Sequence, residues 1–270
     1  MNIRLFIHIV ARRFLYVNIK KSGSITGECG NIAVMKRENL FIENIPAVVW
    51  GDSSKSAFVA VHGDMSHKAD DAIAVFAQEA VSNGYQVISF DLPEHGDRKH
   101  ESTPCKVQNC VHDLHAVMRY ARSYFEDISL FACSMGAYFG LLAYHQEELK
   151  QALLLSPVVD MELIINRMMQ SFDVSEERLS IEKEIKTPIG KTLYWDYYCY
   201  VKEHPIISWK TPTSILCGSE DNINETDVVS AFAKRFGCDL QVMRNGEHYF
   251  HTKEQLSYLR QWLRKRIHLI

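Results

Sequence analysis

The chain has 270 residues, of which 47% are hydrophobic and 23% charged, and its formal net charge is −3. A chain of this size can bury a large core, and α/β folds of this length often form one domain. The small net charge and the lack of a long basic stripe argue against a nucleic-acid partner. Seven scattered cysteines without a C-x-x-C pair indicate neither a disulfide framework nor a zinc ribbon, which favours a reducing, cytoplasmic location.

Residues 1–30 form an N-terminal extension whose role the sequence leaves open. Apolar residues from Leu5 to Val17 fall at helical spacing, and basic residues interrupt them. The interruption disfavours a secretory signal, and no stretch is long and apolar enough to span a bilayer. We expect a helix or strand docked on the core or on the second subunit of a homodimer. A basic amphipathic helix on a membrane surface is the less favoured alternative.

Beyond this extension the hydrophobic pattern alternates between strands and helices. Continuous apolar runs are typical of strands buried in a parallel sheet, and apolar residues three or four apart indicate helices. We predict opening strands, antiparallel at one edge, at 31–36 and 40–50, and then strands at 56–62, 85–90, 128–133, 153–155, 213–217 and 239–243. Helices are predicted at about 69–82, 110–125, 135–144, 227–236 and 253–267.

This order predicts an α/β fold with a mostly parallel central sheet and helices on both of its faces. One domain spans residues 31–270. The mixed, aromatic-rich segment 158–209 breaks the alternation after the sixth strand. We therefore expect it to be a small helical cap, or lid, inserted into the domain.

Ser134 lies where a buried strand turns into a helix with almost no loop between them. Such a corner pushes a side chain out of the sheet edge, and the helix N-terminus beneath it offers free N–H groups to a developing negative charge. Ala132 and Gly136, two residues before and after the serine, are small enough for strand and helix to pass closely. Ser134 is therefore a candidate nucleophile, although a helix N-cap serine would show a similar pattern.

Two other loops at the carboxyl ends of predicted strands carry partners for such a serine. A serine hydroxyl needs an imidazole to take its proton, and a carboxylate to orient that imidazole. His248 follows the last strand and Asp221 follows the preceding one, so we predict the triad Ser134, His248 and Asp221. His251 remains an alternative for the base, and Glu220 and Asp160 remain alternatives for the acid.

The tetrahedral oxyanion of acyl transfer needs two fixed N–H donors. We assign them to the backbone of Met135, after the nucleophile, and of Asp64, in the loop that follows the strand 56–62. The carboxylate of Asp64 must then point away from the oxyanion, toward Lys68 or the start of the next helix.

The motifs HGDMSHK, FDLPEHGDR, ACSMG, CGSEDNI and NGEHYF together resemble the loops of the α/β-hydrolase superfamily, over about residues 40–267. Ala132 replaces the first glycine of the G-x-S-x-G elbow. The single His-Gly of the first loop resembles the group of serine aminopeptidase-like lipases, acyl esterases and feruloyl esterases. The resemblance implies an α/β-hydrolase fold and a triad in the chain order serine, acid, histidine.

We therefore expect a serine hydrolase that cleaves a small-molecule carboxylic ester through an acyl-enzyme. An amidase or aminopeptidase, a thioesterase or an acyltransferase would use the same triad, and a non-catalytic binding protein of the same fold is the alternative from another class. The segment at Gly190 lacks the glycine and the strand of a phosphate-binding loop, and no H-E-x-x-H motif occurs. We expect neither a cofactor nor a metal.

Overall fold

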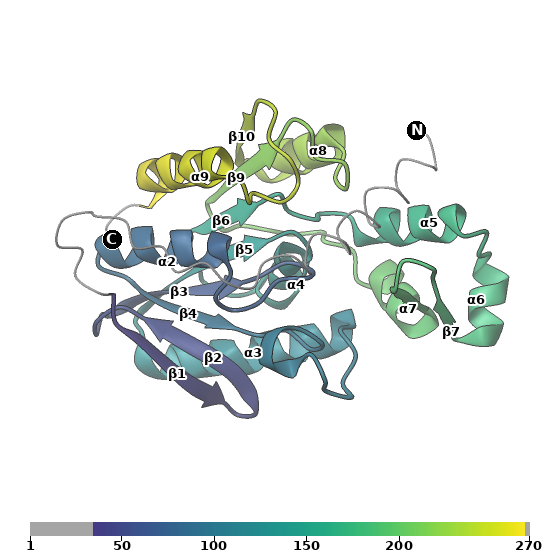
Figure 1. Ribbon diagram of the computed structural model, residues 1–270, viewed down its shortest axis with the longest axis horizontal. Coiled ribbons are helices and arrows are strands. Elements are labelled where there is room, and N and C mark those ends of the chain that lie inside the picture. The colour runs from purple at the N-terminus through teal and green to yellow at the C-terminus, as the bar shows by residue number, and fades with distance from the viewer. Residues whose placement is uncertain (1–34, 268–270) are drawn as a thin grey trace. The chain divides into compact units, whose positions relative to one another are not determined.

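The computed structural model describes residues 35–267 of the chain (Figure 1). These residues divide into two compact units. The larger unit, which we call the body, comprises residues 35–161 and 200–267, and the smaller unit, the cap, comprises Glu162–Cys199. One boundary falls after the first residue of the helix Met161–Ser171, and the other falls within the helix Trp195–Glu203.

The body contains an eight-stranded sheet in the order β1-β2-β4-β3-β5-β6-β9-β10, counted over the described residues (Figure 1). Strand β2 pairs antiparallel with β1 and with β4, and the other neighbouring pairs are parallel. The strands are β1 (Arg37–Ile42), β2 (Ile45–Trp50), β3 (Ser56–Val61), β4 (Gln86–Phe90), β5 (Asp127–Cys133), β6 (Ala152–Leu155), β9 (Thr213–Gly218) and β10 (Asp239–Met243). The mostly parallel sheet with an antiparallel edge is therefore confirmed.

Helices cover both faces of this sheet, as predicted. Figure 1 shows α2 with α9 on one face and α3 with α4 on the other, and each of these pairs is in contact. The helices of the body, with one short 3-10 helix, are α2 (Asp71–Ser82), η1 (Gly96–Arg98), α3 (Val107–Tyr124), α4 (Met135–Ala143), α8 (Thr226–Phe236) and α9 (Lys253–Arg266).

The central strands are buried because their residues are almost all apolar. Phe58 and Val59 of β3 and Phe131 of β5 have no exposed surface. On one face, Phe76 of α2 stacks on Phe131 with ring centroids 3.9 Å apart. Each large apolar side chain buried in this way contributes roughly 1.5–3 kcal/mol of transfer free energy. This core holds the carboxyl ends of β3, β5 and β9 at one edge of the sheet.

The first two strands of the sheet differ from the prediction. The stretch 40–50 is not one strand: β1 and β2 form a hairpin with a two-residue turn at Glu43 and Asn44. Glu43 has a positive φ of 55°, as the first central residue of a tight hairpin turn requires. A Glu-Asn pair carries no glycine to signal that turn. Residues 35 and 36 precede β1 and are not in a strand, and residues 31–34 lie outside the described part.

The cap contains short elements of both kinds. They are the greater part of α5 (Met161–Ser171), α6 (Glu176–Glu182), a hairpin of β7 (Glu184–Lys186) and β8 (Thr192–Tyr194), and the first turn of α7 (Trp195–Glu203). Three-residue strands are too short to show an alternating pattern, so the sequence predicted only helices here. The cap unit lies within the predicted insertion 158–209.

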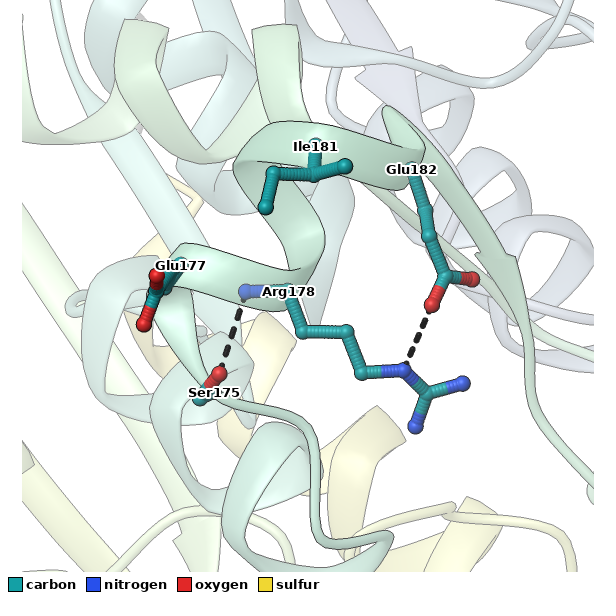
Figure 2. A pocket seen from close by; sticks show the side chains of 5 residues that line it. All are labelled: Ser175, Glu177, Arg178, Ile181 and Glu182. Atoms are coloured by element: carbon teal, nitrogen blue, oxygen red, sulfur yellow. Dashed lines mark hydrogen bonds and ion pairs between the residues drawn. The ribbon is translucent and has the colours of Figure 1, made fainter.

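A pocket of about 270 Å³ lies in the cap, around α6 (Figure 2). Figure 2 shows Arg178 paired with Glu182 at 2.7 Å, while the hydroxyl of Ser175 accepts a hydrogen bond from the backbone N–H of Arg178. Glu177 and Ile181 complete the lining. None of these residues is among the predicted site residues.

The predictions for the N-terminal extension, residues 1–30, lie outside the described residues. Over residues 35–267, no helix combines the length and the hydropathy that crossing a bilayer requires.

Candidate active site

Ser134 occupies the corner between β5 and α4, as the sequence predicts. It has φ 50° and ψ −122°, a conformation that costs a non-glycine residue about 1–3 kcal/mol. Both of its backbone groups are held: its N–H donates to the carbonyl of Leu155 and its carbonyl accepts from the N–H of Val158, each at 3.0 Å. Hydrogen bonds from the surrounding chain therefore hold the backbone of Ser134 in its strained conformation, and this fixes the position of its side chain.

Small residues let the segments around Ser134 approach closely. A Cβ on Gly136 would lie 2.2 Å from the carbonyl oxygen of His62, and one on Gly63 would lie 3.0 Å from the Ser134 Cβ. The loop after β3 is thus packed against the start of α4. Ala132, at the first small position, is fully buried and fits there with its methyl group.

The structure brings the three predicted triad residues together. The Ser134 Oγ lies 2.8 Å from His248 Nε2, and His248 Nδ1 lies 2.8 Å from Asp221 Oδ2. The side chains of His248 and Asp221 are 9% and 2% exposed. With the carboxylate accepting from Nδ1–H, the imidazole presents an unprotonated Nε2 to the serine hydroxyl, which is the tautomer that a general base needs.

The loop after β9 fixes the orientation of the Asp221 carboxylate. Its Oδ1 accepts hydrogen bonds from the backbone N–H groups of Ile223 and Asn224, each at 2.9 Å, which leaves Oδ2 directed at His248. A Cβ on Gly218 would lie 2.1 Å from the carbonyl oxygen of Gly246. Because a glycine allows this contact, the loops that carry the acid and the histidine lie against each other.

The alternatives for these roles are not in the hydrogen-bonded chain. Glu220 is exposed, and its backbone N–H donates to Gly246. His251 hydrogen-bonds through Nδ1 to the Tyr249 carbonyl at 2.8 Å. Asp160 comes directly before α5.

Asn224 is a site residue that the sequence analysis missed. Its side chain is buried and donates to the Ser156 carbonyl at 3.0 Å, and its amide nitrogen lies 3.4 Å from His248 Nδ1. It therefore ties the acid loop to the end of β6. A polar residue three positions after the acid, in a loop of polar residues, gave no signal of this role.

The loop after β3 carries the predicted oxyanion donor Asp64. The direction of the Asp64 carboxylate differs from the prediction. The Asp64 carboxylate does not pair with Lys68: its Oδ1 lies 3.2 Å from His95 Nε2. Met135 is the first residue of α4, where N–H groups have no intrahelical acceptor. The donor roles of Asp64 and Met135 stay predictions.

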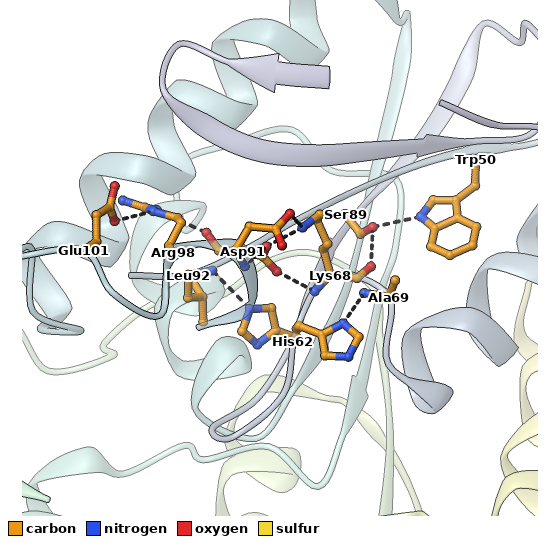
Figure 3. Close-up of polar contacts among 11 residues, drawn as sticks. Trp50, His62, Lys68, Ala69, Ser89, Asp91, Leu92, Arg98 and Glu101 are labelled. Atoms are coloured by element: carbon orange, nitrogen blue, oxygen red, sulfur yellow. Dashed lines mark hydrogen bonds and ion pairs between the residues drawn. The ribbon is translucent and has the colours of Figure 1, made fainter. Parts of the chain in front are cut away.

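Lys68 instead anchors the same loop to the loop after β4 (Figure 3). Its ammonium group lies 2.5 Å from Asp91 Oδ2 and 2.6 Å from Asp97 Oδ2, and Asp91 also accepts from the Lys68 backbone N–H at 2.8 Å. Burial lowers the pKa of Lys68, but the hydrogen bonds to the two carboxylates outweigh burial and raise it. The ammonium group is therefore charged, and the two loops are held together.

His62 forms the second link between these loops, as Figure 3 shows. Its Nε2 accepts from the Leu92 backbone N–H at 3.1 Å, so Nδ1 carries the proton and donates to the Gly63 carbonyl at 2.7 Å. Burial, and after it the charge of the neighbouring His95, lower the pKa of His62 to about 3. The neutral imidazole thus fixes the peptide that joins Gly63 to Asp64.

This lowered pKa predicts a loss of stability in acid. The unfolded His62 titrates near pH 6.5, so the folded state holds fewer protons below that pH. The contribution of the neutral His62 to the free energy of unfolding is therefore complete above about pH 6.5, and it falls as the pH drops toward 3. In urea titrations between about pH 7 and pH 4, the difference in unfolding free energy between the wild type and His62→Gln should shrink with acidification. The exposed His100→Gln is the control, and an equal change in that variant would contradict the prediction.

Comparison with known families identifies the chain. The model of the family described as "Serine aminopeptidase, S33" matches residues 52–188, just over half of the chain. The matched segment includes Asp64 and Ser134 and ends before Asp221 and His248. Among curated protein sequences, none matches the chain.

Solved structures share the fold. Est1E from Butyrivibrio proteoclasticus with bound ferulic acid has a TM-score of 0.70 at 19% identity, covering 84% of this chain and 96% of Est1E. A putative hydrolase from Agrobacterium vitis has a TM-score of 0.68 at 14% identity, covering 86% and 98%. A monoacylglycerol lipase from Paleococcus ferrophilus has a TM-score of 0.59 at 14% identity, covering 82% and 98%. The chain therefore belongs to the serine aminopeptidase-like S33 family of α/β hydrolases.

Proposed function

We propose that this hydrolase cleaves a carboxylic ester through an acyl-enzyme on Ser134, with His248 as the general base and acid and Asp221 as the residue that orients it. The observation that carries the proposal is the hydrogen-bonded chain from Ser134 Oγ through His248 to Asp221, on a serine held in a strained corner. A serine beside a helix N-terminus has no need of such a partner if it serves only as a cap.

In the first half of the reaction, His248 Nε2 takes the hydroxyl proton as Ser134 Oγ attacks the ester carbonyl. The Asp221 carboxylate stabilises the imidazolium that forms. The oxyanion would accept hydrogen bonds from the backbone N–H groups of Met135 and Asp64. When the tetrahedral intermediate collapses, the imidazolium gives its proton to the leaving alkoxide. In the second half, water attacks the acyl-enzyme by the same route and the carboxylic acid leaves.

Two of the structural neighbours favour an ester over other acyl compounds. Est1E binds ferulic acid, a carboxylic acid of the kind that ester cleavage releases, and another neighbour is a monoacylglycerol lipase. The family description, serine aminopeptidase, favours an amide instead. An amidase, thioesterase or acyltransferase would use the same three residues in the same roles, so the experiment must compare substrates as well as detect the nucleophile.

The test is intact-mass analysis of the wild-type chain after treatment with a fluorophosphonate, followed by peptide mapping. We expect one adduct, on Ser134, and none on a Ser134→Ala variant. The wild type should then hydrolyse p-nitrophenyl acyl esters faster than the matched p-nitroanilides and thioesters. Faster anilide cleavage would contradict the ester assignment while retaining the nucleophile. The absence of an adduct on folded protein would favour the non-catalytic binding protein and contradict the proposal.

A further inference from the structure

Two cysteines form a pair at the start of α3, beside the loop after β4. Lys106 is the N-cap of α3, so Cys105 immediately precedes the cap and Cys110 is the fourth helical residue. Residues at these two positions commonly pack against each other at helix starts. Here both are thiols, and their Sγ atoms are 3.6 Å apart. Cys110 is buried, whereas Cys105 is partly exposed.

The surroundings of Cys105 favour its thiolate form. The hydrogen bond from Cys110 lowers the pKa of Cys105 against the effect of burial, and the hydrogen bond with His95 lowers it further. Burial alone would lower the pKa of His95, but its hydrogen bonds to Asp64 and Cys105 raise it to about 10. A helix N-terminus and an adjacent imidazolium are both settings that make a cysteine reactive. Cys105 and His95 thus face each other as thiolate and imidazolium.

Other described cysteines have the opposite character. Burial raises the pKa of Cys133 well above its ordinary value, that of Cys217 to about 12 and that of Cys238 to about 11. Cys238 is partly exposed, as Cys105 is, so exposure does not separate the two. What distinguishes Cys105 is the pair of partners, a thiol and an imidazolium, placed against it.

From this geometry we propose that Cys105 and Cys110 are an oxidation site that hydrogen peroxide converts into a disulfide. The Cys105 thiolate attacks one peroxide oxygen, the O–O bond breaks, and the departing hydroxide takes a proton to become water. Cys105 is then a sulfenic acid. Cys110 loses its proton and attacks the Cys105 sulfur, and the sulfenic oxygen leaves as a second water. Two thiols and one peroxide thus give one disulfide and two waters.

The second step is favoured by the first. Burial raises the pKa of Cys110, and the neighbouring Cys105 thiolate raises it further. That second contribution ends when Cys105 becomes a neutral sulfenic acid, so Cys110 ionises more readily at the moment it must attack. The sulfur atoms have to approach from 3.6 Å to the bonded distance of about 2.05 Å. Cys105 precedes the N-cap of α3, so this approach calls for rotation of a side chain that lies outside the helix.

The disulfide would act on the candidate active site through His95. This imidazole interacts with both Cys105 and the Asp64 carboxylate, and its Nε2 lies 3.2 Å from Asp64 Oδ1. A disulfide removes the thiolate, and with it one of the interactions that raise the pKa of His95 and keep it protonated beside Asp64. This part of the inference rests on the proposed function, in which the Asp64 backbone serves the oxyanion. A donor displaced by about 1 Å costs up to about 10²-fold in rate.

The test for the site is peptide mapping without reductant, after the reduced full-length chain is treated with hydrogen peroxide and free thiols are alkylated. We expect a Cys105–Cys110 cross-link in the wild type and, equally fast, in Cys238→Ser. Cys110→Ser should instead give a dimedone adduct on Cys105, and Cys105→Ser should leave Cys110 reduced. Equal or faster oxidation of Cys238, or sulfinic acid on Cys105 without a cross-link, would overturn the proposal.

The coupling to activity is measured in the same samples. Turnover of a p-nitrophenyl ester should fall roughly tenfold as the cross-link forms and return with dithiothreitol, whereas Cys238→Ser behaves as the wild type and Cys105→Ser does not respond. A cross-link with unchanged turnover would overturn the coupling and leave the oxidation site. Untreated protein without ester turnover would refute the proposed function, and the mapping result would still stand or fall by itself.

Discussion

Replacing Ser134 by alanine should reduce kcat for a p-nitrophenyl ester by about 10⁴-fold or more, without loss of folding. Alanine removes only the Oγ atom, which lies 2.8 Å from His248 Nε2, and keeps the Cβ that the corner accommodates. Without the hydroxyl no acyl-enzyme forms, so the residual rate is that of water attack in the same site. The measurement is steady-state kinetics, with thermal unfolding of both proteins to show that the fold is unchanged.

Ser129→Ala is the matched control. Ser129 lies on the same strand, β5, is fully buried, and its hydroxyl has no hydrogen-bond partner among the described residues. Its replacement should leave turnover within about twofold of the wild type, because a buried hydroxyl without a partner contributes little. If Ser134→Ala retained more than about a tenth of the activity, another residue would have to be the nucleophile.

Asp221→Asn should lower kcat by about 10³–10⁴-fold, even though the side chain keeps its size. The backbone N–H groups of Ile223 and Asn224 occupy Oδ1, so an asparagine would place its oxygen there and turn its NH₂ group toward His248. That group donates, and His248 Nδ1 would have to accept. Nε2 would then carry the proton and could not take the one from Ser134.

Glu220→Gln provides the control for this change. Glu220 is the adjacent acid and is exposed, so its replacement should alter kcat by less than about twofold. Asp160→Asn tests the other alternative in the same assay. A larger effect from either variant than from Asp221→Asn would move the acid role away from Asp221. Comparing kcat with thermal unfolding separates loss of the tautomer from loss of the fold.

The acid and histidine loops show how much of a site a sequence pattern can predict. A serine on a strand-to-helix corner and polar residues at the carboxyl ends of two later strands predicted which side chains would meet, because parallel strands end at one edge of the sheet. The pattern favoured Asp221 as the acid but left Glu220 as an alternative. That choice depends on the turn in which Ile223 and Asn224 bind one carboxylate oxygen, and on the contact of Gly218 with Gly246.

The sequence pattern could not predict contacts between loops that are far apart in sequence. The sequence suggested that the Asp64 carboxylate points toward Lys68 or the start of the next helix. In the structure Lys68 pairs with Asp91 and Asp97, and Asp64 pairs with His95, all on the loop after β4. The Glu43 turn was missed for a local reason, since no glycine marks it.

By itself, the sequence determined the family, the mostly parallel sheet, the order of its elements and the strand ends at which Ser134, a histidine and an acid come together. The sheet and the order of its elements follow from hydrophobic periodicity, and the meeting of the site residues follows from where the strands end. The family was given by the resemblance of the loop motifs. All three are local properties of the chain. Only the tertiary structure decided which acid is oriented toward His248, what holds the loop of Asp64, and that Cys105 faces both Cys110 and His95. These depend on the directions of side chains from separate loops, which are fixed only when the sheet brings the loops together.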